Sequence, residues 1–201
     1  HDTLLLKYKN LLKSNQWIWD VRVPQFIPEI ASGKAAKLSN KRILCVGTDM
    51  AVGKMTTSLE MYKWAIEKKI NSSFIATGQI GITITGDGIP LDAYKVDHAC
   101  GAVEHMVLKN KNSDWVFIEG QGSLLNPGST ASLPLMRGSC ITHMILCHRA
   151  DFKTLRDYKH IKIPDLNNVI KLYEDLASAC GSYPNAKVVG ISLNTYKLGS
   201  V

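Results

Sequence analysis

The residues best suited to chemistry in this 201-residue chain stand in the stretch 43–58, which reads ILCVGTDMAVGKMTTS. A short apolar run predicts a buried strand, a glycine-bracketed loop follows it, and helical spacing begins after Lys54. Backbone amides of such a loop, backed by the positive end of a helix, bind anionic oxygens. Lys54 is expected to be exposed and to place a mobile ammonium over terminal phosphates. The stretch therefore predicts a phosphate-binding loop.

A second polar position is expected to complete a nucleotide site. Asn194 follows the apolar run 188–193, and its amide can both donate to and accept from a nucleobase edge. The predicted cofactor-binding residues are Gly47, Thr48, Asp49, Ala51, Val52, Gly53, Lys54, Met55, Thr56 and Asn194.

The loop departs from the common phosphate-binding pattern G-x-x-x-x-G-K-[ST]. Thr48 stands where the first glycine is usual, and Met55 replaces the hydroxyl residue after the lysine. Thr56 or Thr57 must then supply a magnesium contact, or nothing from this turn does. An ordinary glycine-containing turn with a solvated lysine is the alternative, and the strand before and the helix after favour phosphate binding.

A second candidate site motif, EGQGS, begins at Glu119, directly after the apolar run WVFI at 115–118. A carboxylate at a strand end beside a phosphate loop suits Mg²⁺, which takes a few protein oxygens together with nucleotide phosphates. The alternative is a structural turn with an exposed glutamate. We predict Lys54, Glu119 and Gln121 as catalytic residues, and Thr56, Glu119 and Asp92 as metal ligands.

Two stretches rich in Gly, Pro and polar residues, 77–92 and 124–138, are predicted to be irregular loops around a substrate. A basic segment at 151–163 is predicted to form a further loop over the site. The residues expected to contact substrate lie in or next to these stretches and are Thr77, Gln79, Asp87, Ser123, Arg137 and His148.

Alternating short apolar runs and helical patterns predict an α/β fold with a mostly parallel sheet flanked by helices. Strands are expected at 43–46, 72–76, 115–118, 143–147 and 188–193, and helices from residue 56, at 93–109 and at 166–179. Helical spacing at 4–12 and a strand at 17–23 precede a linker at 33–40. We expect residues 1–40 to be the end of an N-terminal domain with its connector, and residues 41–201 to be a nucleotide-binding domain truncated at both ends.

The composition is that of a globular protein, with 45% hydrophobic and 20% charged residues. The net charge of +7 comes from lysines and arginines spread along the chain, without an aromatic RNA-reading motif, so nucleic-acid binding is not predicted. No apolar run reaches the ~20 residues needed to cross a bilayer. We expect a cytoplasmic homo-oligomer with no membrane partner. Its five scattered cysteines are expected to be buried, reduced thiols.

The motifs GTDMAVGK and EGQGS resemble the dethiobiotin synthetase and cobyrinic acid amidase branch of P-loop enzymes. The longer strings VGTDMAVGKMTTSLE, FIATGQIGI, GDGIPLDA, WVFIEGQGSLLNP and VVGISLNT more closely resemble a P-loop family catalogued as a domain of unknown function, which includes D-glutamate N-acetyltransferases. The resemblance covers residues 17–195. It implies a P-loop (Rossmann-like) fold that follows a separate N-terminal domain. The resemblance to the dethiobiotin synthetase branch implies that Asn194 recognises a base.

The leading functional hypothesis is a Mg²⁺- and ATP-dependent, ligase-like enzyme. It would activate a carboxylate by phosphorylation and pass the acyl group to an amine on an amino acid. The first alternative is an N-acetyltransferase that acts on a D-amino acid such as D-glutamate, with acetyl-CoA in the phosphate cradle. The second alternative is a non-catalytic nucleotide-binding switch. The expected partners are a nucleotide and a small amino-acid-like substrate.

Overall fold

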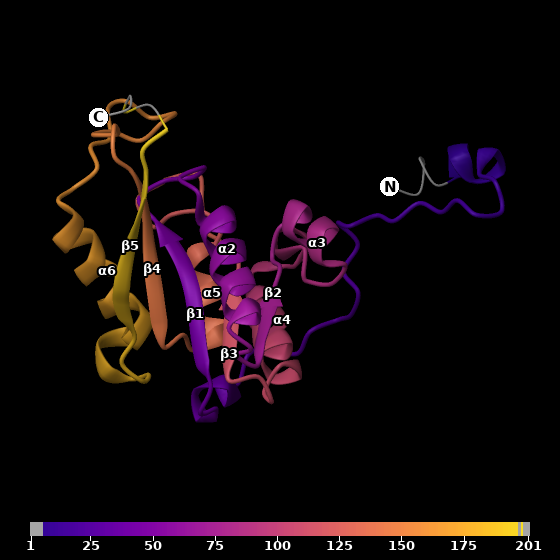
Figure 1. Ribbon diagram of the computed structural model, residues 1–201, viewed down its shortest axis with the longest axis horizontal. Helices are drawn as coiled ribbons and strands as arrows, with labels where there is room; N and C mark the ends of the chain where they lie inside the picture. The colour runs from indigo at the N-terminus through magenta and orange to yellow at the C-terminus, as the bar shows by residue number, and fades with distance from the viewer. Residues whose placement is uncertain (1–5, 197, 199–201) are drawn as a thin grey trace.

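A single five-stranded sheet organises the computed structural model, which describes residues 6–196 and 198. The strands are all parallel and lie in the order β2-β3-β1-β4-β5 (Figure 1). They are β1 (Lys41–Gly47), β2 (Ser72–Ile75), β3 (Trp115–Ile118), β4 (His143–Arg149) and β5 (Lys187–Asn194). The predicted α/β class with a parallel sheet is confirmed.

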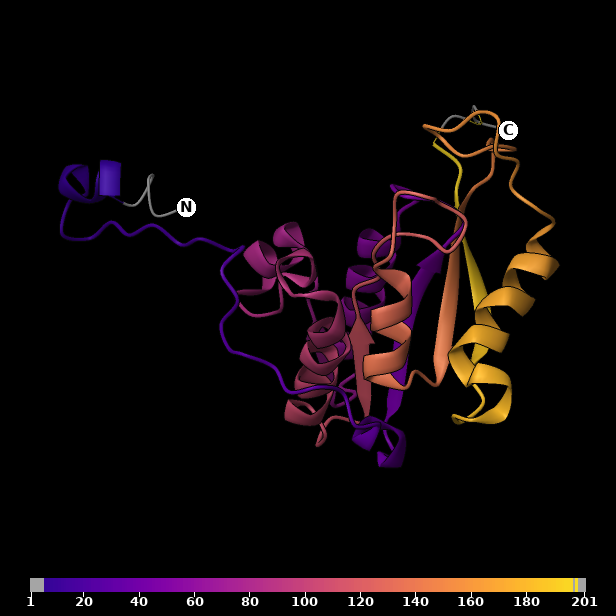
Figure 2. The ribbon, with the colours of Figure 1, turned by 180° about the vertical axis from the view of Figure 1, so that it is seen from behind.

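Helices cover both faces of this sheet (Figures 1 and 2). The helices are α2 (Lys54–Glu67), α3 (Gln79–Thr85), α4 (Val96–Lys109), α5 (Ser132–Ser139) and α6 (Leu166–Ser178). Short 3₁₀ turns are η1 (Lys9–Leu11), η2 (Lys34–Lys37), η3 (Leu91–Ala93) and η4 (Ala179–Gly181). None of the described helices is long and apolar enough to cross a lipid bilayer.

Alternate residues of β1 build the two hydrophobic layers, because successive side chains of a strand point to opposite faces. Leu44 and Val46 face the large core formed with α4, α5 and α6. Ile43 faces the smaller layer beneath α2, where it packs with Ala65 and Phe117. Since β1 is covered on both sides, the loop at its carboxyl end rests on a rigid base.

The chain that precedes the sheet is fixed to α4 only in its later part. The Glu104 carboxylate accepts hydrogen bonds from the Ser32 backbone at 2.7 Å and from the Ser32 hydroxyl at 3.1 Å. A Cβ on Gly101 would lie 1.7 Å from the Glu29 carbonyl oxygen, so glycine is required where the connector crosses the helix. Residues 6–16 extend away from the sheet (Figure 1).

Several local predictions were wrong. Residues 17–23 form no strand. Residues 17–20 are irregular, a turn and a bend follow at 21–23, and Trp17 packs against Trp19. Of the helix predicted at 4–12, residues 4 and 5 lie outside the described residues, and residues 6–8 are helical ahead of η1. Residues 17–23 lie away from the sheet and have, among the described residues, no neighbouring strand with which to form backbone hydrogen bonds.

Two predicted loops contain helices instead. The stretch 77–92 holds α3 and η3, and the stretch 124–138 leads into α5. Pro134 is compatible with α5 because it lies in the first turn, where backbone amides have no partner within the helix. The segment 151–163 is largely irregular, as predicted.

The cysteines follow the prediction only in part. Cys45, Cys140 and Cys147 are buried free thiols, whereas Cys100 is partly exposed and Cys180 is exposed.

Candidate functional site

The loop between β1 and α2 lies at the carboxyl edge of the sheet. Gly53 has φ of 107° and Ala51 has φ of 54°, so the chain turns twice through left-handed conformations before α2 begins at Lys54. Glycine adopts such a conformation without steric cost. A Cβ on Gly47 would lie 2.8 Å from a Val52 methyl and 3.1 Å from Lys54 Nζ, which shows how tightly the loop folds over its own start.

Lys54 is buried, and the expectation of an exposed, mobile ammonium was wrong. Its side chain is 6% exposed, and its Nζ donates a hydrogen bond to the Asp49 carbonyl oxygen at 2.7 Å. Burial lowers the pKa of Lys54 from 10.5 to about 8, partly opposed by nearby acidic groups, of which Cys147 and Asp49 are the largest. A desolvated ammonium held inside a loop of amides attracts an anion more strongly than a solvated one. The loop is therefore preorganised for phosphate.

The Asp49 carboxylate accepts hydrogen bonds from three donors within the protein. Oδ1 accepts from the Met50 backbone at 2.7 Å and from Asn126 Nδ2 at 2.8 Å, and Oδ2 accepts from the Arg156 backbone at 2.6 Å. The side chain is buried. The carboxylate thus joins the phosphate loop to two other loops, and the cofactor contact of Asp49 stays a prediction.

Thr48 and His148 form a second link across the edge of the sheet. Thr48 Oγ1 is hydrogen-bonded to His148 Nδ1 at 2.9 Å, and both residues are buried. Burial lowers the pKa of His148, with the Asp151 carboxylate acting in the opposite direction. His148 is therefore neutral near pH 7, and a neutral imidazole can accept a proton. This predicted substrate residue does lie against the phosphate loop.

Glu119 lies at the end of β3, as predicted, but its carboxylate faces the start of α3. Oε2 accepts from the backbone of Thr77 at 2.8 Å and of Gly78 at 3.0 Å. A Cβ on Gly81 would lie 2.2 Å from this oxygen, so α3 needs a glycine on the side that faces Glu119. Burial raises the pKa of Glu119, and the two amide hydrogen bonds oppose the shift.

Gln121 and Thr77 complete the cluster around Glu119. The Thr77 hydroxyl donates to the Glu119 backbone oxygen at 2.9 Å. Gln121 Nε2 donates to the Thr77 backbone oxygen and, at 3.1 Å, to its hydroxyl. Gln79 opens α3 beside them, and its Nε2 contacts Asp92 Oδ2 at 3.4 Å. Thr77 and Gln121 are thus brought together with Glu119, and Gln79 and Asp92 form a separate contact next to them.

The predicted magnesium ligands do not converge on one metal-binding position. Across the described residues, no group of three or more His, Cys, Asp or Glu side chains gathers where a metal could bind. Thr56 and Asp92 are exposed, and one Glu119 oxygen is engaged by two backbone amides. This donor set does not fit a metal held by protein side chains alone, and magnesium stays a prediction.

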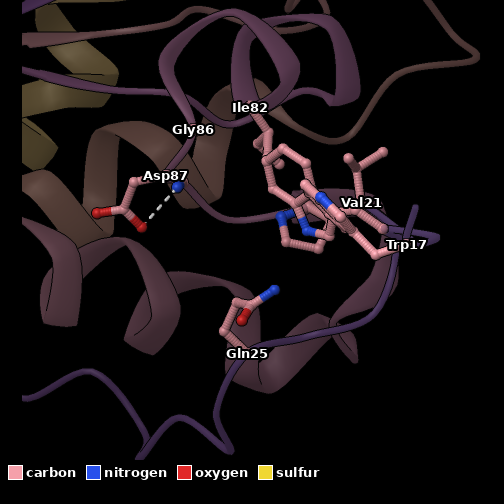
Figure 3. A pocket seen from close by; sticks show the side chains of 9 residues that line it. Trp17, Val21, Gln25, Ile82, Gly86 and Asp87 are labelled. Atoms are coloured by element: carbon pink, nitrogen blue, oxygen red, sulfur yellow. Dashed lines mark hydrogen bonds between the residues drawn. The ribbon is translucent and has the colours of Figure 1, made fainter. Parts of the chain in front are cut away.

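Asp87 and Arg137 are not assembled with the phosphate loop. Asp87 forms an ion pair with Lys109 at 2.8 Å and lines a separate pocket of about 420 Å³, formed with Trp17, Val21 and Gln25 (Figure 3). Arg137 lies in the last turn of α5, with its guanidinium 5.0 Å from the Tyr183 ring centroid. Arg137 lines a second pocket, and none of the residues lining either pocket belongs to the phosphate loop.

The remaining predicted contacts lie on polar turns at the strand ends. Asn194 ends the edge strand β5, and its Oδ1 accepts from the Tyr196 backbone at 3.1 Å. Ser123 is buried, and its hydroxyl accepts from the Leu125 backbone at 3.1 Å. Their roles toward nucleotide and substrate stay predictions.

Sequence reasoning missed two residues that hold the loop. Asn126 reaches the Asp49 carboxylate, and Tyr173 of α6 donates its hydroxyl hydrogen to the Gly47 oxygen at 2.8 Å. The Tyr173 oxygen also accepts from the Leu124 backbone at 3.1 Å. The sequence around Asn126, which is rich in Pro and Gly, does not predict its contact with Asp49. The helical pattern around Tyr173 does not predict its contact with Gly47 either.

Parallel strands in this order, with a glycine-bracketed loop and a lysine at the start of the following helix, define a P-loop protein. More particularly, the chain belongs to the family described as "Domain of unknown function (DUF1611_C) P-loop domain", which matches residues 29–200. The resemblance noted in the sequence is thereby confirmed.

Named relatives share most of this chain. A D-glutamate N-acetyltransferase of Pseudoalteromonas sp is 39% identical over 184 residues, which are 91% of this chain and 54% of that protein. Another, of Tritonibacter scottomollicae, is 41% identical over 181 residues, or 90% of this chain and 53% of that protein. The crystal structure of a DUF1611 family protein from Anabaena variabilis matches with a TM-score of 0.90 and 51% identity, covering 94% of this chain and 55% of that one. This chain spans about half the length of the proteins it matches.

Proposed function

We propose that this chain is the donor-binding part of an N-acetyltransferase that acts on an acidic D-amino acid such as D-glutamate. The observation that carries the proposal is the buried Lys54 within its loop of amides, in a chain about 40% identical to two proteins named for that activity. The loop would hold the phosphate groups of an acetyl donor such as acetyl-CoA. The amino-acid substrate follows from the names of these two relatives, and the acetyl donor is part of the proposal.

In this acetyl transfer, the main task of the protein is to position the acetyl donor and the acceptor amine. The amine nitrogen of the acceptor attacks the thioester carbonyl, a C–N bond forms, and the C–S bond breaks with the electron pair leaving on sulfur. The nitrogen loses one proton to a base. Fixed phosphates anchor the donor, and holding both reactants in one geometry lowers the barrier without further chemical groups.

A second candidate is amide formation driven by Mg²⁺ and ATP. Lys54 begins the helix that follows β1, and Glu119 directly follows the neighbouring strand β3. This arrangement favours the second candidate, because such pairs accompany nucleoside triphosphates. The acceptor would then react with an acyl phosphate, and phosphate would leave in place of the thiolate. A nucleotide switch without catalysis would bind the same ligand and turn over none of it.

The test offers the purified full-length protein D-glutamate or L-glutamate, with acetyl-CoA alone or with acetate, ATP and Mg²⁺. We expect N-acetyl-D-glutamate and free thiol with acetyl-CoA alone, in equal amounts. Formation of ADP or AMP with acetate and ATP would support the second candidate instead. Absence of any acetylated product under both conditions would contradict both enzymatic proposals. The Lys54→Met variant serves as the control without the cationic group.

A further inference from the structure

A cavity of about 510 Å³ opens at the carboxyl end of β4, next to the start of α6. His148, Phe152, Lys153, Lys162 and Asp165 line it. Its volume suits a small molecule of the size of an amino acid. The cavity shares no lining residue with the pocket that holds Asp87 or the one that holds Arg137.

Two lysines give this cavity a positive wall. Lys153 and Lys162 lie on the two arms of a hairpin, joined by an antiparallel bridge between Thr154 and Lys162 and by a hydrogen bond from the Ile163 backbone to the Lys153 oxygen at 2.9 Å. Within the described chain, neither ammonium has an ion-pair partner. The one acidic side chain of the lining, Asp165, accepts from the Asn167 backbone at 2.8 Å as the cap of α6. The two ammonium groups are therefore available to pair with an anionic ligand.

The hairpin is held to the phosphate loop. The Arg156 backbone, at its turn, donates to Asp49 Oδ2 at 2.6 Å, and Leu155 is fully buried. The lysines therefore belong to a segment anchored beside the proposed donor site.

His148 lies between the cavity and the phosphate loop. Its Nδ1 is occupied by the Thr48 hydroxyl at 2.9 Å. Its Nε2 has no hydrogen bond among the described residues, and the side chain lines the cavity. His148 therefore contacts the phosphate loop through one ring nitrogen and, within the described part of the chain, leaves the other free at the cavity.

We propose that this cavity binds the acceptor amino acid, with Lys153 and Lys162 pairing with its carboxylates and His148 Nε2 receiving its amine. The proposal rests on the proposed function and names the place of its acceptor. A dicarboxylic amino acid fits because it offers one carboxylate to each lysine. During acyl transfer, the proton lost by the nitrogen passes to His148 Nε2, while the leaving group departs from the acyl carbon with its electron pair.

The experiment separates the two ring nitrogens of His148. An asparagine amide can take the place of Nδ1, so His148→Asn keeps the Thr48 contact and removes the basic Nε2, whereas Thr48→Val removes that contact and keeps both ring nitrogens. Because an amide cannot accept a proton at neutral pH, we expect kcat to fall at least tenfold in His148→Asn and to fall less in Thr48→Val. A loss in His148→Asn no larger than that in Thr48→Val would show a structural role and overturn the assignment of Nε2.

Lys153→Met and Lys162→Met test the carboxylate contacts, with Lys171→Met on the outer face of α6 as the control of equal charge. We expect the KM for D-glutamate to rise about 10- to 100-fold in each cavity variant, with donor KM unchanged, since charge-assisted hydrogen bonds are of this strength. Calorimetry of D-glutamate binding provides a readout without turnover. If acetylation proceeds with unchanged KM in both variants, the cavity is refuted while the proposed function stands. If the protein acetylates nothing, lysine-dependent binding of D-glutamate still supports the cavity, and absence of binding overturns it.

Discussion

The backbone N–H of Arg156 donates to the buried Asp49 carboxylate at 2.6 Å, across 107 residues of sequence. The same carboxylate accepts from Asn126 Nδ2 at 2.8 Å. Three loops that leave different strands therefore share one anion. A buried carboxylate that satisfies several donors makes these loops a single unit, and the phosphate loop keeps its shape through contacts that no local sequence pattern specifies.

Asp49→Asn should destabilise the protein by about 2–3 kcal/mol, because one donor would then face the new amide hydrogens and stay unsatisfied. Urea denaturation followed by fluorescence measures the change. Asn126→Ala is the comparison, since it removes the donor to Asp49 and leaves the Asp49 carboxylate with its two backbone partners. The variant also removes the acceptor of the Gly128 backbone, so its loss sets an upper bound on the contact between Asn126 and Asp49. A smaller loss in Asp49→Asn than in Asn126→Ala would contradict the role given to this carboxylate.

Lys54→Met should stabilise the ligand-free protein by about 1–2 kcal/mol near pH 7. Burial lowers the pKa of Lys54 to about 8, so protonation costs stability in the folded state, and the lost hydrogen bond to the Asp49 oxygen offsets part of the gain. Between pH 8 and 10.5 the unfolded chain holds a proton that the folded protein lacks, so wild-type stability rises with pH. The advantage of the variant should shrink over that window. A variant less stable than wild type at pH 7 would contradict this account.

The affinity for ADP should fall as pH rises above 8, by up to about tenfold per pH unit, because ligand-free Lys54 then loses the proton that the bound phosphates require. Titration calorimetry between pH 7 and 9.5 follows this change and should show proton uptake on binding. In Lys54→Met the affinity should be at least about tenfold weaker and independent of pH over this range. A pH-independent wild-type affinity would exclude Lys54 as the phosphate partner.

Gly120→Ala should prevent folding or cost more than about 3 kcal/mol. The added Cβ would lie 1.5 Å from the Cys45 backbone oxygen, where no flexible side chain can move aside. Gly190→Ala is the control, because its Cβ meets only the Ile145 side chain at 3.4 Å, and we expect a change within about 1 kcal/mol. Thermal unfolding compares the two. A stable, folded Gly120→Ala protein would show that β3 does not approach β1 so closely.

The sequence was informative wherever a pattern is local. Apolar runs located all five strands, and glycines with a lysine after the first strand located the phosphate loop. The positions of Glu119, directly after β3, and of His148, near the end of β4, could be predicted because apolar runs precede them. The burial of Lys54 was missed because it depends on the Asp49 carbonyl and on strands β1 and β4 beneath it. Helix α3 was missed because Gly81 is selected by contact with Glu119, which lies 38 positions later by number. Its glycine therefore suggested a loop.

Tyr173 connects the phosphate loop to α6 through the Gly47 oxygen and the Leu124 backbone. Its hydroxyl is buried, so the position of α6 is transmitted to the loop without passing through any ligand-contacting side chain. Substitutions that shift α6 by a fraction of an ångström would therefore change donor affinity. Substitutions on the packed side of this helix, at Val169 or Ala177, are thus a route to altered donor affinity that leaves the binding loop itself untouched.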